Sequence, residues 1–164
     1  MARRALVPFD GSAKGRRVID NITWDIKPAD MAELANALAA ANLPIADIAE
    51  PGRRFFRITQ AGEAIGYAGI EGDGPDQLLR SFVILATRRR QGLGSAMLAL
   101  VEDKARADAA VRLHLLTTSA AAFFAKHGYA PADRADAPAT IANSREFAGI
   151  CPASATYLIK LLGR

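Results

Sequence analysis

The fold is decided by the sequence TRRRQGLGS, residues 87–95, which joins an apolar stretch to an amphipathic one. The preceding residues 78–86 (LLRSFVILA) are rich in branched and aromatic side chains, as expected of a buried strand. After it, apolar residues recur at helical spacing from Met97 to Val101, so we expect a helix that begins near Gly92. This order suits a phosphate-bearing ligand, because free backbone N–H groups and the helix dipole favour an anion at the start of the helix.

Two common phosphate-binding motifs are excluded by the residues that follow the arginines. A P-loop has a Lys between its last Gly and the Ser or Thr, but here Gly94 is followed directly by Ser95. A dinucleotide-binding fingerprint has a third Gly where this chain has Met97. A purely structural turn is the remaining alternative to an anion-binding loop.

The composition indicates one domain and argues against several kinds of site. A chain of 164 residues is long enough for a single core, and no apolar run approaches the ~20 residues that span a membrane. The single cysteine, Cys151, cannot form an internal disulfide, so we expect a cytoplasmic protein. No Cys/His cluster is present, so no metal site is expected.

The net charge of +4 is concentrated near the N-terminus. Residues 1–20 contain five Arg or Lys and two Asp, which leaves one net positive charge over residues 21–164. A nearly neutral body predicts neither a nucleic-acid partner nor a membrane partner. We expect residues 1–20 to be a flexible basic extension and residues 21–164 to be a single domain.

The other elements follow from hydrophobic periodicity. The residue before a proline tends to end a helix, and glycine often marks a turn, so these residues set the boundaries. A helix connects the expected strands at residues 78–86 and 111–116, and two strands joined in this way favour parallel pairing. The expected strands cover residues 22–26, 54–59, 64–70, 78–86, 111–116 and 155–162, with a short strand at Tyr129. The expected helices begin near Gly92 and cover residues 29–41, 120–126 and 139–150.

Two motifs resemble the GNAT superfamily of N-acetyltransferases. Arg89, Gly92 and Gly94 match its acyl-CoA pyrophosphate loop, Gln/Arg-x-x-Gly-x-Gly/Ala. The segment SAAAFFAKHGY, residues 119–129, resembles the helix that follows its central strand. Within the superfamily, the chain resembles the acetyltransferase domain of bacterial N-acetylglutamate synthases and the small acetyltransferases of arsenic-resistance operons. The resemblance implies a mixed α/β fold, with a central twisted sheet of six to seven strands flanked by helices and two splayed parallel strands.

The resemblance also implies an activity, a cosubstrate and partners. The activity is acetyl transfer from acetyl-CoA to the primary amine of a small molecule, plausibly an amino acid or an amino-acid-like toxicant, by direct attack in a ternary complex. Members of the superfamily are often dimers, so a homodimer is compatible with it. The residues assigned to acetyl-CoA are Phe82, Val83, Ile84, Arg89, Arg90, Gln91, Gly92, Leu93, Gly94, Ser95 and Phe124.

The chain departs from the superfamily at Phe124, where many members carry a tyrosine that protonates the leaving thiolate. A hydroxyl at Thr117, Thr118 or Ser119, or a water, is a candidate for that role, and Glu71 is a candidate base acting through water. Arg80 interrupts an apolar strand, so it is either a surface residue or a group that binds an acidic substrate. The missing tyrosine also motivates an alternative function, a catalytically silent CoA-binding regulatory module.

Overall fold

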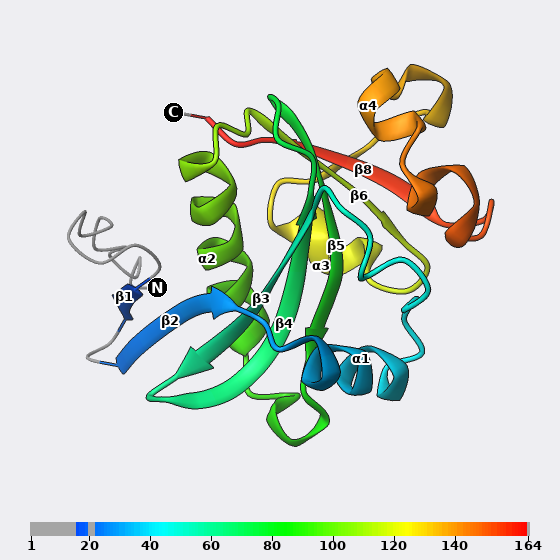
Figure 1. Ribbon diagram of the computed structural model, residues 1–164. Helices are drawn as coiled ribbons and strands as arrows, with labels where there is room; N and C mark the ends of the chain where they lie inside the picture. Colours follow the sequence, from blue (N-terminus) through cyan, green and yellow to red (C-terminus); the bar gives the residue numbers. More distant parts are fainter. Residues whose placement is uncertain (1–15, 20–21, 164) are drawn as a thin grey trace.

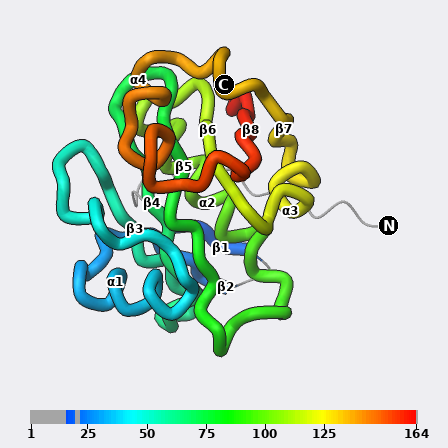
Figure 2. Tube along the Cα trace, turned by 90° about the vertical axis from the view of Figure 1, so that its right-hand side faces the viewer, coloured from blue at the N-terminus to red at the C-terminus, as the bar shows by residue number. Residues whose placement is uncertain are grey.

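The computed structural model describes residues 16–19 and 22–163, which form an eight-stranded sheet with helices on both faces (Figures 1 and 2). The strands lie in the order β1-β2-β3-β4-β5-β6-β8-β7. Only β5 and β6 are parallel; every other neighbouring pair in this described sheet is antiparallel. The strands are β1 (Arg16–Ile19), β2 (Ile22–Pro28), β3 (Arg53–Gln60), β4 (Glu63–Glu71), β5 (Asp76–Ile84), β6 (Arg112–Thr117), β7 (Ala130–Pro131) and β8 (Thr156–Leu161). The helices are α1 (Met31–Ala40), α2 (Leu93–Ala107), α3 (Ala121–Lys126) and α4 (Ala139–Ala142).

The predicted mixed α/β fold is confirmed, and so is the parallel pairing of the two central strands. The expected number of strands, six to seven, was too low. Residues 16–19, expected in the flexible extension, form β1, and this strand pairs with β2. The rest of that expected extension, residues 1–15 and 20, lies outside the described residues.

Helices α1 and α2 cover opposite faces of the sheet (Figures 1 and 2). On one face, α2 packs Met97, Leu98 and Val101 into the largest hydrophobic cluster, against the strands of the sheet. On the other face, Leu34 and Leu38 of α1 belong to a separate cluster. The C-terminal segment forms a third cluster, whose buried members are Leu78, Ile141, Phe147 and Tyr157.

A β-bulge in the middle of β5 changes which side chains face each layer. Ser81 has a φ of 55°, in the left-handed region, and the register of β4 against β5 shifts at this point. Side chains alternate along a strand, and the extra residue of a bulge shifts that alternation by one. Phe82 therefore belongs with the cluster under α2, whereas Val83 belongs with the cluster under α1.

The parallel strands β5 and β6 are joined over only three residue pairs, from Asp76↔Arg112 to Leu78↔His114. Side chains strengthen this short contact. Arg112 donates two hydrogen bonds to Asp76, at 2.6 and 2.7 Å, and His114 Nε2 lies 2.7 Å from Asp76 Oδ1. On the other side of the His114 ring, Nδ1 lies 2.6 Å from the Tyr157 hydroxyl. Beyond Leu78 the two strands no longer pair, and this separation opens the space described below.

The pKa values of this group are consistent with a neutral imidazole. Burial lowers the pKa of His114, although Asp76 opposes that shift. The Arg112 hydrogen bonds hold the pKa of Asp76 below its ordinary value. Burial raises the pKa of Tyr157 to about 12, so its hydroxyl keeps its proton. The His114 Nε2–H therefore donates to Asp76, and Nδ1 accepts from Tyr157.

The single helix expected over residues 139–150 was wrong, because the chain forms two short pieces there. Helix α4 ends at Ala142, and a π-helical turn follows at Glu146–Ile150. The Ser144 hydroxyl donates to the carbonyl of Ile141 at 2.7 Å and accepts from the N–H of Phe147 at 3.2 Å. A serine side chain that bonds nearby backbone groups competes with continuous helix.

Over the described residues, no helix combines the length and the apolar character needed to cross a bilayer.

We predict that Asp76→Ala lowers the free energy of unfolding by about 1–3 kcal/mol, because the buried His114 N–H loses its acceptor. Urea unfolding at neutral pH, followed by the fluorescence of the buried Trp24, measures this loss. The matched control is Asp73→Ala in the exposed turn before β5. Equal urea midpoints for the two variants would show that the Asp76 contacts do not stabilise the sheet.

Candidate active site

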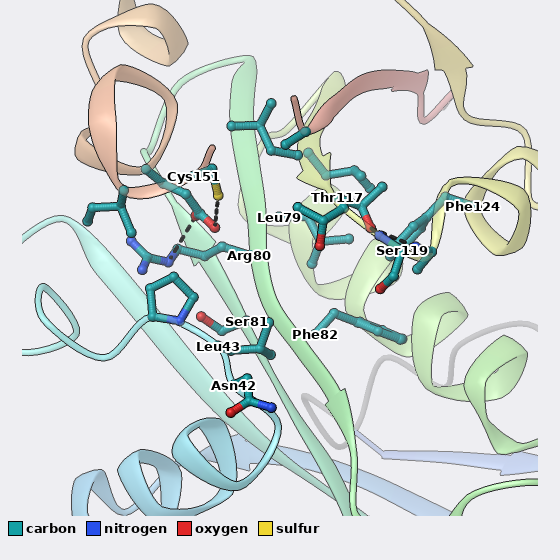
Figure 3. A pocket seen from close by; sticks show the side chains of 18 of the residues that line it. Asn42, Leu43, Leu79, Arg80, Ser81, Phe82, Thr117, Ser119, Phe124 and Cys151 are labelled. Atoms are coloured by element: carbon teal, nitrogen blue, oxygen red, sulfur yellow. Dashed lines mark hydrogen bonds and ion pairs between the residues drawn. The ribbon is translucent and has the colours of Figure 1, made fainter. Parts of the chain in front are cut away.

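A cavity of about 580 Å³ lies where β5 and β6 separate. One wall comes from the β6–α3 connection and α3, including Thr117, Ser119 and Phe124. The opposite wall comes from the α1–β3 loop and the C-terminal segment, and Figure 3 shows Cys151 and Arg80 on that side. Strand β5 runs between these two walls (Figure 3). Because β5 has no pairing with β6 beyond Leu78, its backbone groups there are available to a ligand.

The segment between β5 and α2 forms an open helix N-terminus, as the sequence predicted. Gly92 occupies the cap position with a φ of 70°, and no side chain caps the helix. A side chain at this position would be strained, because the left-handed region suits glycine. Gly94 lines the cavity, and a Cβ there would lie 3.2 Å from the Phe123 ring. The first N–H groups of α2 therefore have no side-chain acceptor, and this is the arrangement that binds anions.

The three arginines of this segment have different roles. Arg88 donates to Glu63 at 2.9 Å and to Gln60 at 2.8 Å, so it holds the segment against the β3–β4 hairpin. Arg89 is exposed and donates through Nε to the carbonyl of Ile84 at 3.2 Å, and Arg90 is exposed as well. The guanidinium groups of Arg89 and Arg90 are not paired with a carboxylate in the described part of the chain.

Helix α3 is attached to the start of α2 through a histidine. His127 Nδ1 lies 2.8 Å from the carbonyl of Phe123, so it carries the hydrogen in the neutral ring. His127 Nε2 then accepts from the hydroxyl of Ser95 at 2.8 Å. The Ser95 side chain is therefore engaged with α3.

The wall formed by α3 is aromatic. Phe124 is buried, and its ring packs edge-on against Phe82 at a centroid distance of 5.7 Å and against Tyr129 at 5.4 Å. Nearby, Thr117 Oγ1 accepts backbone N–H groups from Ala120 at 2.9 Å and from Ser119 at 3.4 Å. These bonds use the oxygen of Thr117 as an acceptor, so its hydroxyl hydrogen is free to donate.

The opposite wall contains a buried ion-pair network centred on Arg80, whose side chain is 0% exposed. Arg80 makes two hydrogen bonds of 2.6 Å to Asp47 and one of 3.1 Å to Glu71. Its Nε lies 3.3 Å from Glu146 Oε2, which is an ion pair without hydrogen-bond geometry. Neither atom has a hydrogen-bond partner among the described residues. The other oxygen of Glu146 accepts from the Cys151 thiol at 3.4 Å.

The pKa values in this network follow from burial and from the position of each charge. Burial alone would raise the pKa of Asp47, but Arg80 and Arg53 hold it below its ordinary value. Burial raises the pKa of Glu146, and the charge of Arg80 and the Cys151 thiol only partly oppose the shift. Burial, together with Glu146, also raises the pKa of Cys151 to about 12, so this residue is a neutral thiol at neutral pH.

Eight of the sixteen residues that the sequence singled out for the site line the cavity: Arg80, Phe82, Ile84, Gly94, Thr117, Thr118, Ser119 and Phe124. Glu71 and Val83 do not, because Glu71 pairs with Arg80 and Val83 packs under α1. Residues 89–93 and Ser95 lie around the start of α2 and are not part of the cavity lining. All three guanidinium nitrogens of Arg80 face carboxylates, Nε facing Glu146 Oε2 at 3.3 Å.

Sequence reasoning did not assign a role to Glu146 or Asp47. Glu146 lines the cavity, and Asp47 is fully buried beside Arg80. The one available signal was Arg80 itself, because a buried arginine requires acidic partners. That signal does not say which of the chain's acidic residues would supply them.

A family model described as an acetyltransferase (GNAT) domain matches residues 51–131. The matched residues include β5, the arginine segment, α2 and α3. Residues 51–131 of this chain belong to the GNAT superfamily. No curated protein matches the sequence.

Solved GNAT structures share the fold of this domain at low sequence identity. N-acetylglutamate synthase from Neisseria gonorrhoeae, complexed with coenzyme A and L-arginine, has a TM-score of 0.66 and 18% identity over 86% of this chain. A GNAT-family acetyltransferase from Staphylococcus aureus has a TM-score of 0.65 and 15% identity, over 85% of this chain and 99% of its own. The ribosomal-protein-S18-alanine N-acetyltransferase from Escherichia coli has a TM-score of 0.60 and 19% identity, over 86% and 95%.

The Neisseria synthase is much longer than this chain, which spans about a third of it, 34% of its length. The family model stops at residue 131, so it includes Arg80 and Glu71 but neither Asp47 nor the C-terminal segment with Glu146. The GNAT domain of this chain therefore builds one wall of its cavity from residues outside the matched region.

We predict that Arg80→Met lowers the free energy of unfolding by about 3–5 kcal/mol, because buried carboxylates lose their counter-charge. The matched control is Arg145→Met, which removes an exposed guanidinium paired with Glu50 and should cost less than about 1 kcal/mol. Urea denaturation of both variants at neutral pH measures the difference. A loss for Arg80→Met as small as the control's would mean that the network adds no stability.

Proposed function

We propose that this domain transfers an acetyl group from acetyl-CoA to the primary amine of a small molecule, by direct attack in a ternary complex. The observation that carries the proposal is the cavity between the separated strands β5 and β6. Gly94, at the uncapped start of α2, lines one wall, and the buried Arg80–Glu146 pair lies in the opposite wall. The uncapped start of α2 is complementary to an anionic cosubstrate, and the Glu146 carboxylate is complementary to an amine acceptor.

The cosubstrate would bind along β5 and at the start of α2. Arg89 and Arg90, with the backbone N–H groups of residues 91–95, suit the pyrophosphate of acetyl-CoA. The unpaired backbone of residues 82–84 suits the amide groups of the pantetheine arm, and the Phe124 ring would pack beside it. The Neisseria synthase supports this assignment, since its structures contain coenzyme A.

The reaction requires a free amine and a protonated leaving thiol. Phe124 has no hydroxyl, so a different group must protonate the departing thiolate. Thr117 suits this task because its oxygen accepts backbone N–H groups while its hydrogen is free, and Ser119 lies next to it in the wall. No protein nucleophile is required, because the amine attacks the thioester directly.

An amino acid or an amino-acid-like toxicant is the acceptor that we propose. The cavity volume suits a small molecule beside the pantetheine arm. A second structure of the Neisseria synthase contains coenzyme A and N-acetyl-glutamate, which is an acetylated amino acid. Arg80 lines the cavity, and it is the residue that we assign to a carboxylate of such an acceptor. A reducing cytoplasm is the compartment that we propose, since Cys151 is a free thiol.

The test is the release of free thiol from acetyl-CoA in the presence of amino acids and of phosphinic and arsenical analogues of glutamate. We expect turnover with at least one amine. Arg89→Ala should weaken CoA binding about tenfold, because it loses a charge-assisted contact to phosphate. Gly92→Trp should weaken binding at least as much, because the side chain would occupy the anion site with strained backbone.

The matched controls are Arg57→Ala and Gly163→Trp, and both should bind CoA like the wild type. Gly163 shares the left-handed φ and the open surroundings of Gly92 but lies after β8. CoA binding without turnover for any amine would favour a catalytically silent regulatory module. Absence of CoA binding in the wild type would contradict the proposed function altogether.

A further inference from the structure

Glu146 is an acidic residue in the cavity wall, and its environment is unusual for a carboxylate. Its side chain is 8% exposed, and Oε2 has no hydrogen-bond partner among the described residues. The other oxygen, Oε1, is held by the Cys151 thiol. Figure 3 shows Cys151 and Arg80 on the same side of the cavity, and both contact the Glu146 carboxylate. The nearest donor to Oε2 is Arg80 Nε at 3.3 Å, but without hydrogen-bond geometry, so this carboxylate is less fully satisfied than one that accepts a hydrogen bond at each oxygen.

The charges around Glu146 leave it without a full counter-charge. Arg80 faces it from β5, but Arg80 already pairs with Asp47 and Glu71. The second cation of the network, Arg53, also pairs with Asp47 and Glu71. Arg53 also meets Glu50, which pairs with Arg145, so three guanidinium groups meet four carboxylates. Glu146 is the one of the four that lines the cavity. A positively charged group in the cavity would balance it.

We propose that Glu146 is the catalytic base that accepts a proton from the acceptor ammonium. This inference rests on the proposed function. Glu146 Oε2 takes one proton from the ammonium, and the nitrogen lone pair then forms a bond to the thioester carbonyl carbon. The carbon–sulfur bond breaks, and the second proton lost by the nitrogen reaches the CoA thiolate through Thr117 or water. The products are an amide, CoA as a thiol and a protonated Glu146, which returns its proton to solvent.

Neighbouring groups fit this step less well. Glu71 does not line the cavity, and both of its oxygens face arginines. Asp47 accepts from two arginines, and its lowered pKa makes it a weak base. The Cys151 thiol stays neutral near pH 7, so it acts as a positioning residue that holds Oε1.

The direction of the Glu146 pKa shift suits a base. Burial raises this pKa, Arg80 and the Cys151 thiol oppose the shift, and the charges of Asp47 and Glu71 add to it. A base with a raised pKa takes a proton more readily at neutral pH. The wild-type kcat/KM should therefore fall as the pH is lowered through a value above the ordinary pKa of a glutamate, since a protonated carboxyl cannot accept a proton.

The decisive variant is Glu146→Gln, which keeps the size of the side chain and removes the base. We expect kcat to fall about a hundredfold or more with the amine that gives turnover, while CoA binding is unchanged. The variant should depend on amine that is already deprotonated in solution. Its kcat/KM should therefore keep rising with pH up to the pKa of the amine itself, whereas a purely structural defect would leave the pH profile unchanged.

The controls separate a chemical role from a structural one. Glu50→Gln removes a carboxylate at the exposed edge of the same network and should leave kcat and the pH profile unchanged. Glu146→Asp keeps the carboxylate but shortens its reach, so we expect an intermediate kcat with the wild-type form of the pH profile. If Glu146→Gln does not bind CoA, Glu146→Asp is the variant that tests whether Glu146 acts as the base.

Two results would contradict the inference in distinguishable ways. The first is that the wild type turns over and Glu146→Gln has the same kcat and pH profile. If Glu146→Gln does not bind CoA, the same result for Glu146→Asp counts instead. This outcome would overturn the role of Glu146 and leave the proposed function intact. A wild type that gives no turnover with any amine would overturn the proposed function, and the inference with it.

Discussion

The structure depends on the short pairing between β5 and β6. The two parallel strands share only three residue pairs, and Asp76 binds Arg112 and His114 across them. Beyond this point both strands continue, but their facing backbone groups no longer bond to each other. A sheet rarely leaves such groups unused, because each one buried without a partner costs free energy. The separation is tolerated here because the pairing at one end is strong and because the open end forms a binding cavity.

Local patterns in the sequence were sufficient for most of the fold. Periodicity located the main strands and helices, and the crossover through α2 predicted the parallel pair. Gly92 and Gly94 were interpretable because their roles depend on backbone geometry within a few residues. The bulge at Ser81 was not predictable, since serine has no special preference for positive φ. The interruption at Ser144 was missed because its side chain competes with a helix that the flanking residues support.

The candidate site was predictable only in the half that is local in sequence. The segment that we propose binds an anion, residues 87–95, is continuous, so one stretch of sequence defines it. The network around Arg80 joins residues from four parts of the chain, namely Asp47, Glu71, Arg80 and Glu146. Only the folded sheet brings them together, and no spacing rule relates them. Position then distinguishes otherwise equivalent carboxylates, since Glu71 faces two arginines whereas Glu146 faces only Arg80, without a hydrogen bond to it.

The two cavity walls come from different parts of the chain, and this has a consequence for the stability of the site. The arginine segment, α2 and α3 lie within the region matched by the family model, whereas the π-helical turn with Glu146 lies after it. That turn is a separate short piece, because Ser144 ends the preceding helix. The turn is nevertheless tied to the sheet, because Glu146 faces Arg80 of β5 and Phe147 packs with Leu78 and Tyr157. A substitution in this turn therefore changes the cavity wall and the support of β5 together.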